Sequence, residues 1–60
     1  MENNIKHTTA IEDLLRYEQF MVKMYRRHSV NCRDQQTKIA LERLSASHQN
    51  QYDALLKQLN

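Results

Sequence analysis

Glu18 and His48 are the two residues of this sequence best suited to chemistry, because each interrupts an apolar helical stripe. At about 100° per residue, residues 11–25 present one broad apolar surface with Glu18 in its middle. Residues 37–59 present a second stripe, and His48 lies near its centre. A buried carboxylate without a partner takes up a proton or is strongly destabilising, so we expect the two side chains to contact each other. Such a pair can form a hydrogen bond or supply two ligands to a zinc-like ion.

Two helices are needed to bring these side chains together. Residues 9–12 match a capping box and predict a first helix over residues 9–29. The pattern breaks near residues 30–33, where Asn31 followed by Asp34 resembles the N-cap of a second helix over residues 33–58. So short a connection makes the helices antiparallel neighbours, which places position 18 level with positions 45–48. We therefore expect a hairpin over residues 9–60, preceded by a flexible arm of residues 1–8 that lacks periodicity.

The composition favours a single small all-α domain. The 60 residues contain no Gly and no Pro, which argues against tight β-hairpin turns. The one cysteine, Cys32, cannot form an internal disulfide, and no His-rich cluster indicates a structural zinc site. A formal net charge of +2 is too small to indicate a nucleic-acid partner. No apolar run approaches the roughly 18 residues of a membrane span, and no signal peptide is visible, so we expect a cytoplasmic protein without a membrane partner.

The apolar surface of the first helix is too broad for one neighbouring helix. It covers about half of the helix circumference, whereas a single partner requires about 100°. A chain of this length also needs a stabilising device besides its own core, and oligomerisation is the one that its composition leaves. We therefore predict that two antiparallel hairpins dimerise into a four-helix bundle. The predicted dimer core consists of Leu14, Leu15, Met21, Val22, Leu41, Leu44, Leu55 and Leu59.

Several positions carry a resemblance to a known family. They are Asp13, Leu14, Leu15, Glu18, Tyr25, Arg33, Leu55 and Leu56, with a stretch rich in Gln and His before the last two. A glutamate on the first helix and a histidine on the second resemble half of a ferritin-like bundle, and within that group the chain is similar to the short hairpins of the spore coat protein F family. The resemblance implies a ferritin-like four-helix bundle and association with the spore coat.

The same resemblance implies a metal site at Glu18 and His48. Ferritin-like di-metal proteins combine a Glu on one helix with a Glu-x-x-His on the next. Here Ser45 stands three residues before His48 in place of the acid, so a di-iron oxidase is not predicted. A two-fold dimer would still offer two carboxylates and two imidazoles, which leaves open a single divalent metal as the only cofactor.

Three classes of function remain. We favour a non-catalytic, homo-oligomeric interaction or structural protein in which Glu18 and His48 form only a polar core pair. A metal-binding protein is the alternative, which the incomplete ligand set disfavours. An enzyme is not expected, because no Ser or Cys has an evident base at useful spacing.

The third class is a small regulator that docks an acidic partner protein. Its contact surface would be a basic patch of Arg16, Lys23, Arg26, Arg27 and Arg33. A purely structural interpretation is that the basic residues near the end of the first helix complement the helix dipole. Nucleic acid is the least favoured partner, because few aromatic residues are available for base stacking.

Overall fold

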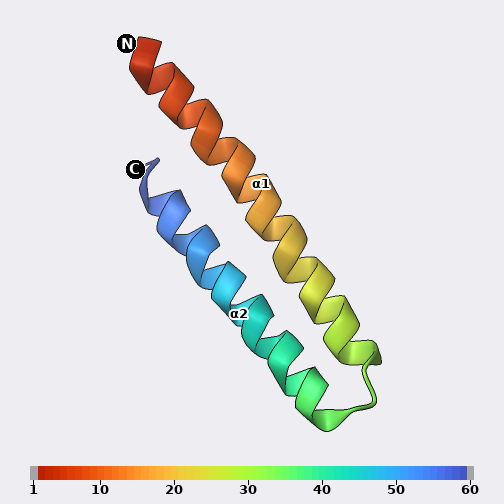
Figure 1. Ribbon diagram of the computed structural model, residues 1–60. Helices are drawn as coiled ribbons and strands as arrows, with labels where there is room; N and C mark the ends of the chain where they lie inside the picture. The colour runs from red at the N-terminus through yellow and green to blue at the C-terminus, as the bar shows by residue number, and fades with distance from the viewer. Residues whose placement is uncertain (1, 60) are drawn as a thin grey trace.

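Two long helices joined by a short connection form an antiparallel hairpin (Figure 1). The computed structural model describes the backbone of residues 2–59 and the side chains of residues 6–59. Helix α1 spans Glu2–Asn31 and helix α2 spans Gln35–Lys57. The described ends of the chain lie at the same end of the hairpin, and α1 extends beyond α2 (Figure 1). The hairpin measures 50 × 14 × 11 Å across its Cα atoms. The predicted antiparallel two-helix architecture is therefore confirmed for one chain.

Helix α1 begins at Glu2, which differs from the predicted start at Thr9. The part of the predicted arm that the structure describes is thus helical, and Met1 lies outside the described residues. A capping box needs its first residue in a non-helical backbone, so the one predicted at Thr9 is wrong. The physical reason is that the chain has no Gly or Pro to stop the helix from extending towards the N-terminus.

The connection contains residues 32–34, and Asp34 is the N-cap of α2. Its backbone is extended (φ −77°, ψ 120°), and its Oδ2 accepts hydrogen bonds from the Thr37 amide at 2.8 Å and the Thr37 hydroxyl at 2.6 Å. Asn31 was the predicted cap, but its side-chain amide donates to the Arg27 carbonyl at 3.0 Å. Asn31 therefore ends α1, and Asp34 begins α2.

The C-terminal end of α2 lies close to the prediction. The helix ends at Lys57 with Gln58 as its C-cap, and the Gln58 amide donates to the Leu55 carbonyl at 2.9 Å. The predicted end was residue 58. Asn60, the last residue of the predicted hairpin, lies outside the described residues.

The core between the helices is thin. Of residues 6–59, only Ile11 and Val22 are buried apolar side chains, accompanied by the buried polar residues Glu18, Ser29 and Ser45. The radius of gyration is 14.4 Å, against about 10 Å for a compact domain of 60 residues. The accessible surface is 4924 Å², whereas a compact protein of 7.2 kDa exposes about 4100 Å². The hairpin thus leaves much of its apolar surface uncovered.

Within residues 2–59, neither helix combines the length and the hydropathy needed to cross a membrane.

Candidate functional site

The structure brings Glu18 and His48 together between the two helices. Nδ1 of His48 is hydrogen-bonded to Oε1 of Glu18, across thirty positions of sequence. The Glu18 side chain is 8% exposed and that of His48 is 16% exposed, so the pair is largely shielded from water. The contact follows from the register of the hairpin, in which residues 18 and 48 lie level with each other.

Two tyrosines hold the imidazole of His48 in place. The Tyr25 ring stacks on it with centroids 5.5 Å apart and planes inclined by 22°. The Tyr17 ring meets it nearly edge-on, with centroids 6.4 Å apart and an interplanar angle of 76°. Stacked and edge-to-face arrangements are the favourable geometries for aromatic pairs. The imidazole is therefore fixed in orientation by one hydrogen bond and two rings.

Gln51 also contacts Glu18, and this contact was not predicted from the sequence. With its amide oriented to satisfy both partners, the side-chain nitrogen donates to Oε2 of Glu18 at 2.7 Å and to Oε1 at 3.2 Å. Both carboxylate oxygens are thus occupied. The signal was present in the sequence, since Gln51 follows His48 by three positions and so lies on the same side of α2. We call Glu18, His48 and Gln51 the polar cluster.

Ser45 contributes to the helix contact and not to the polar cluster. Its hydroxyl donates to the Val22 carbonyl at 3.2 Å, and both residues are buried. A small side chain at this position lets the two backbones approach, and the hydroxyl bridges them directly.

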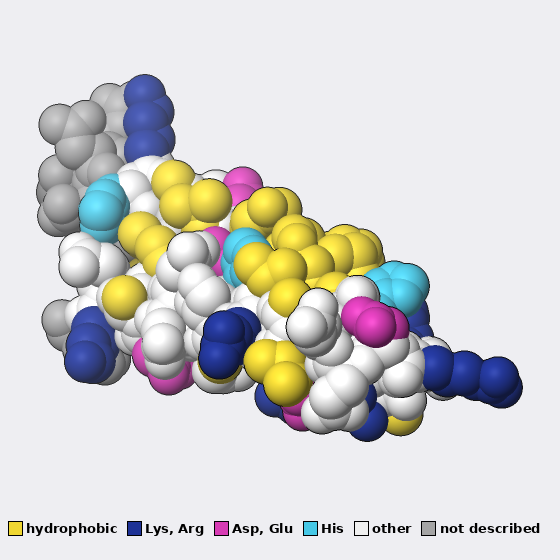
Figure 2. Space-filling view, turned by 60° about the horizontal axis from the view of Figure 1, so that its bottom comes forward, with side chains coloured by type: hydrophobic (Ala, Val, Ile, Leu, Met, Phe, Trp, Pro, Cys, Tyr) yellow, Lys and Arg dark blue, Asp and Glu magenta, His cyan; other side chains and the backbone are white. Residues whose placement is uncertain are grey.

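One side of the hairpin forms a broad apolar face. Residues spaced by three or four positions line the same side of a helix. The rings of Tyr17 and Tyr25 on α1 contact the ring of His48 on α2. The apolar residues in line with these side chains on each helix therefore lie on the same side of the hairpin. Figure 2 shows hydrophobic side chains gathered in a band with a histidine among them. This apolar face comprises Leu14, Tyr17, Met21, Met24 and Tyr25 of α1 and Leu41, Leu44 and Leu55 of α2.

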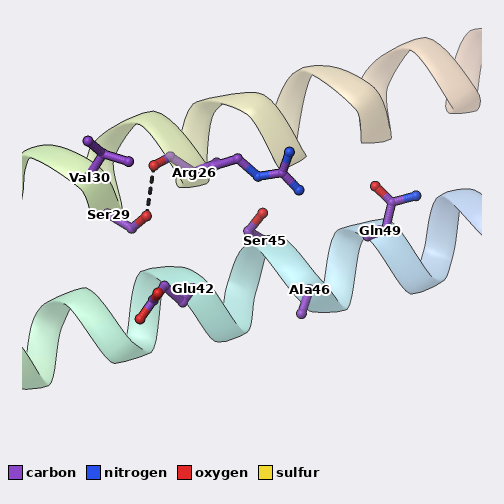
Figure 3. Close-up of a pocket in the computed structure, with 7 residues that line it drawn as sticks. All are labelled: Arg26, Ser29, Val30, Glu42, Ser45, Ala46 and Gln49. Atoms are coloured by element: carbon purple, nitrogen blue, oxygen red, sulfur yellow. Dashed lines mark hydrogen bonds between the residues drawn. The ribbon is translucent and has the colours of Figure 1, made fainter.

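The opposite side of the hairpin carries a groove with both polar and apolar lining residues. The groove has a volume of about 440 Å³ and is open to solvent. Its lining residues are Arg26, Ser29, Val30, Glu42, Ser45, Ala46 and Gln49. Figure 3 shows the Arg26 side chain extending between the helices towards Gln49, while the Ser29 hydroxyl donates to the Arg26 carbonyl at 2.7 Å. None of the residues of the polar cluster lines this groove. Its one cationic side chain, Arg26, shares the lining with the Glu42 carboxylate.

The residues predicted for the dimer core fall into different environments. Val22 is buried between α1 and α2 of one chain, so it belongs to the hairpin core. Leu14, Leu44 and Leu59 are exposed. The half-buried members are Leu15, Met21, Leu41 and Leu55.

The five residues predicted for the basic patch are all exposed, and Lys23 and Arg26 line one groove. One exposed line of α1 contains Arg16, Lys23 and Arg27, which are spaced by seven and four residues. Arg16 is also paired with Asp13. Arg26 lines the groove, and Arg33 lies in the connection.

A metal site within one chain would require more ligands than the structure gathers. Among the described residues, no group of three or more His, Cys, Asp or Glu side chains is placed to hold an ion. The polar cluster supplies one carboxylate and one imidazole, and these are bonded to each other.

Comparison with known proteins gives no match, whether with family models, with curated proteins or with solved structures. The resemblance to the spore coat protein F family therefore stays a prediction that rests on the residues named for it.

Proposed function

We propose that the chain is a non-catalytic, self-associating helical module in which two hairpins pair through their apolar faces to form a four-helix bundle. The observation that carries this proposal is the exposure of large apolar side chains on one side of the hairpin. Leu14 is 46% exposed, Tyr17 is 51% exposed and Leu44 is 41% exposed. Contiguous apolar patches of this kind mark protein interaction sites.

The surface area supports a second copy as the occupant of the apolar face. The hairpin exposes 4924 Å², an excess of about 800 Å² over a compact protein of its mass. One partner in a standard protein interface buries about 800 Å². Each of two hairpins that cover each other's apolar face would thus expose about as much surface as a compact monomer of 7.2 kDa.

The geometry of the polar cluster also favours a structural role over catalysis. A carboxylate and an imidazole can activate a hydroxyl or thiol nucleophile when one lies within hydrogen-bonding reach of the free ring nitrogen. Among the described residues, Ser45, three positions before His48, donates its hydroxyl to the Val22 carbonyl. Ser47, the neighbour of His48 in sequence, is exposed. Cys32 donates its thiol to the Asp34 carbonyl at 3.4 Å, at the turn.

Molar mass in solution, measured by sedimentation equilibrium and light scattering from micromolar to nanomolar concentration, tests the proposal. We expect twice the 7.2 kDa of one chain at micromolar concentration, with helix content lost as the dimer dissociates. A helical, cooperatively unfolding monomer at nanomolar concentration would contradict it.

Two matched variants locate the interface. Leu44→Asp places a charge on the apolar face and should give an unfolded chain by circular dichroism. Ile39→Asp is the control, because Ile39 is 38% exposed and lies on α2 about 140° away from Leu44. It should leave the dimer intact. Equal effects of the two substitutions, or an intact dimer of Leu44→Asp, would show that the apolar face is not the interface. A folded monomer of Leu44→Asp would show that the single hairpin is self-sufficient.

A further inference from the structure

The two ends of the hairpin differ in charge. The half that contains the turn, residues 19–46, carries six Lys or Arg and two Asp or Glu, a formal charge of +4. The open half, residues 6–18 and 47–59, carries three Lys or Arg and four Asp or Glu, a formal charge of −1. In the C-terminal third of α1, Lys23, Arg26 and Arg27 follow one another without an intervening acid. The level of the Glu18–His48 contact marks the boundary between these halves.

This asymmetry distinguishes the two ways in which a second copy could cover the apolar face. If the turns lay at the same end, the two +4 halves would lie against each other. If the turns lay at opposite ends, each +4 half would lie against a −1 half. Like charges brought together across an interface are unfavourable and fix the orientation of partners. The charges therefore favour the arrangement with turns at opposite ends.

The polar cluster adds a second constraint, on the axial position of the partner. Nδ1 of His48 is bonded to Glu18, and no described residue bonds to the other ring nitrogen, Nε2. No described side-chain polar atom is fully buried without a partner, so Nε2 still reaches solvent in the single hairpin. A second copy on the apolar face would remove that solvent. A buried polar atom left without a partner is destabilising, so registers that place only leucines opposite Nε2 are disfavoured.

The polar cluster lies in the central part of the apolar face. Leu14 and Leu55 lie on its open side, and Met21 and Leu44 lie on its turn side. When the two copies run in opposite directions, a two-fold axis at the level of His48 places cluster against cluster and still overlaps most of both apolar faces. A shift by one helical turn, about 5.4 Å, would place His48 against apolar side chains of the other copy.

From these observations we infer that the second copy binds antiparallel, with the turns at opposite ends and the two polar clusters level with each other. A single polar position that specifies the register of paired helices is a known device in coiled coils. This inference rests on the proposed self-association and adds its orientation and register.

The lone cysteine provides the experiment. Cys32 lies at the turn, fourteen positions from Glu18, so two copies joined at the cluster level place their Cys32 residues about 40 Å apart at 1.5 Å per residue. Turns at the same end would bring them within about 10–20 Å, because neighbouring helix axes lie 8–10 Å apart. Nitroxide labels on Cys32 and pulsed dipolar spectroscopy measure this distance.

A second label position tests the register. The variant Cys32→Ser with Ser47→Cys moves the label to the exposed face of α2, one position from His48. We expect this pair of labels to be about 20 Å apart, the width of a bundle built from helices 8–10 Å apart. Unchanged molar mass and circular dichroism of each labelled protein serve as the control for folding.

The outcomes separate the two proposals. A long distance at Cys32 together with a short one at position 47 supports the antiparallel register. A short distance at Cys32, or long distances at both positions, would overturn it while the dimer itself stands. A monomeric mass without dipolar coupling would overturn self-association and, with it, this inference.

Discussion

The ring of Tyr25 stacks on the imidazole of His48 across the two helices, with centroids 5.5 Å apart. This contact leaves His48 little freedom to turn away from Glu18, to which its Nδ1 is bonded. The aromatic stack and the hydrogen bond therefore act on the same ring, and each supports the other. Because Tyr25 belongs to the apolar face, the packing of that face and the geometry of the polar cluster are connected.

Removal of one partner of the polar cluster should destabilise the fold. Glu18→Leu leaves Nδ1 of His48 and the Gln51 amide without their acceptor, which should lower the free energy of unfolding by about 1–3 kcal/mol. Urea denaturation at one fixed protein concentration measures this, since dimer stability depends on concentration.

The double variant Glu18→Leu with His48→Leu provides the matched comparison. Replacement of both partners by apolar side chains should restore or exceed the stability of the wild type. A single Glu18→Leu variant as stable as the wild type would show that the hydrogen bond makes no net contribution. A gain in stability from the single variant would indicate that the pair is kept for function and not for folding.

A larger side chain at Ser45 should separate the helices. Ser45 is 6% exposed and its hydroxyl donates to the Val22 carbonyl, so Ser45→Leu removes a direct bridge and overfills a close contact. We expect a loss of about 1–3 kcal/mol in the free energy of unfolding. Ser47→Leu, at an exposed position two residues away, should change it by less than about 0.5 kcal/mol. Similar losses in both variants would argue against the close contact.

The N-cap of α2 should make stability depend on pH in the acid range. The hydroxyl of Thr37, and secondly its amide, donate hydrogen bonds that lower the pKa of Asp34 below its ordinary value of 3.8. A lowered pKa in the folded state means that this stabilisation is present above pH 3.8 and is lost as the pH falls through the folded-state pKa.

The variant Asp34→Asn isolates this effect, because Asn also caps helices but does not titrate. The wild type should lose stability relative to Asp34→Asn as the pH is lowered below 3.8, as measured by urea midpoints across a pH series. A constant difference between the two proteins over that range would contradict the assignment.

Metal removal should leave the protein unchanged. Both oxygens of Glu18 are already occupied by His48 and Gln51, so binding of an ion would have to displace these hydrogen bonds. We expect substoichiometric metal by elemental analysis of untagged protein, and the same unfolding curve with and without a chelator. Stoichiometric metal with chelator-sensitive unfolding would favour the ferritin-like alternative.

The sequence predicted the hairpin and the meeting of Glu18 with His48 for the same physical reason. Helical periodicity identified the inner side of each helix, and the short connection placed position 18 level with positions 45–48 in an antiparallel hairpin. The first residue of α1 could not be predicted in the same way, because residues 9–12 resemble a helix start although nothing before them prevents helix formation.

Two further features could not be predicted from the sequence: the N-cap of α2 and the ring contact of Tyr25. Asn31 and Asp34 are both good N-caps, and only the structure shows that the Asn31 side chain is engaged with the Arg27 carbonyl. The stacking of Tyr25 on His48 is a further feature that helical periodicity alone does not specify. Phe20, at 60% exposure, remains an apolar residue outside the apolar face, and nothing in the structure explains it.

The connection of residues 32–34 keeps α1 and α2 from forming one continuous helix. It contains no Gly and no Pro, so helix formation is opposed there chiefly by the extended backbone and the side-chain cap of Asp34. If these three residues adopted helical dihedrals, α1 and α2 would fuse into one straight rod. In two such rods side by side, α1 of one chain could pack against α2 of the other and form the same contacts between chains. The cap of Asp34 therefore also opposes domain swapping.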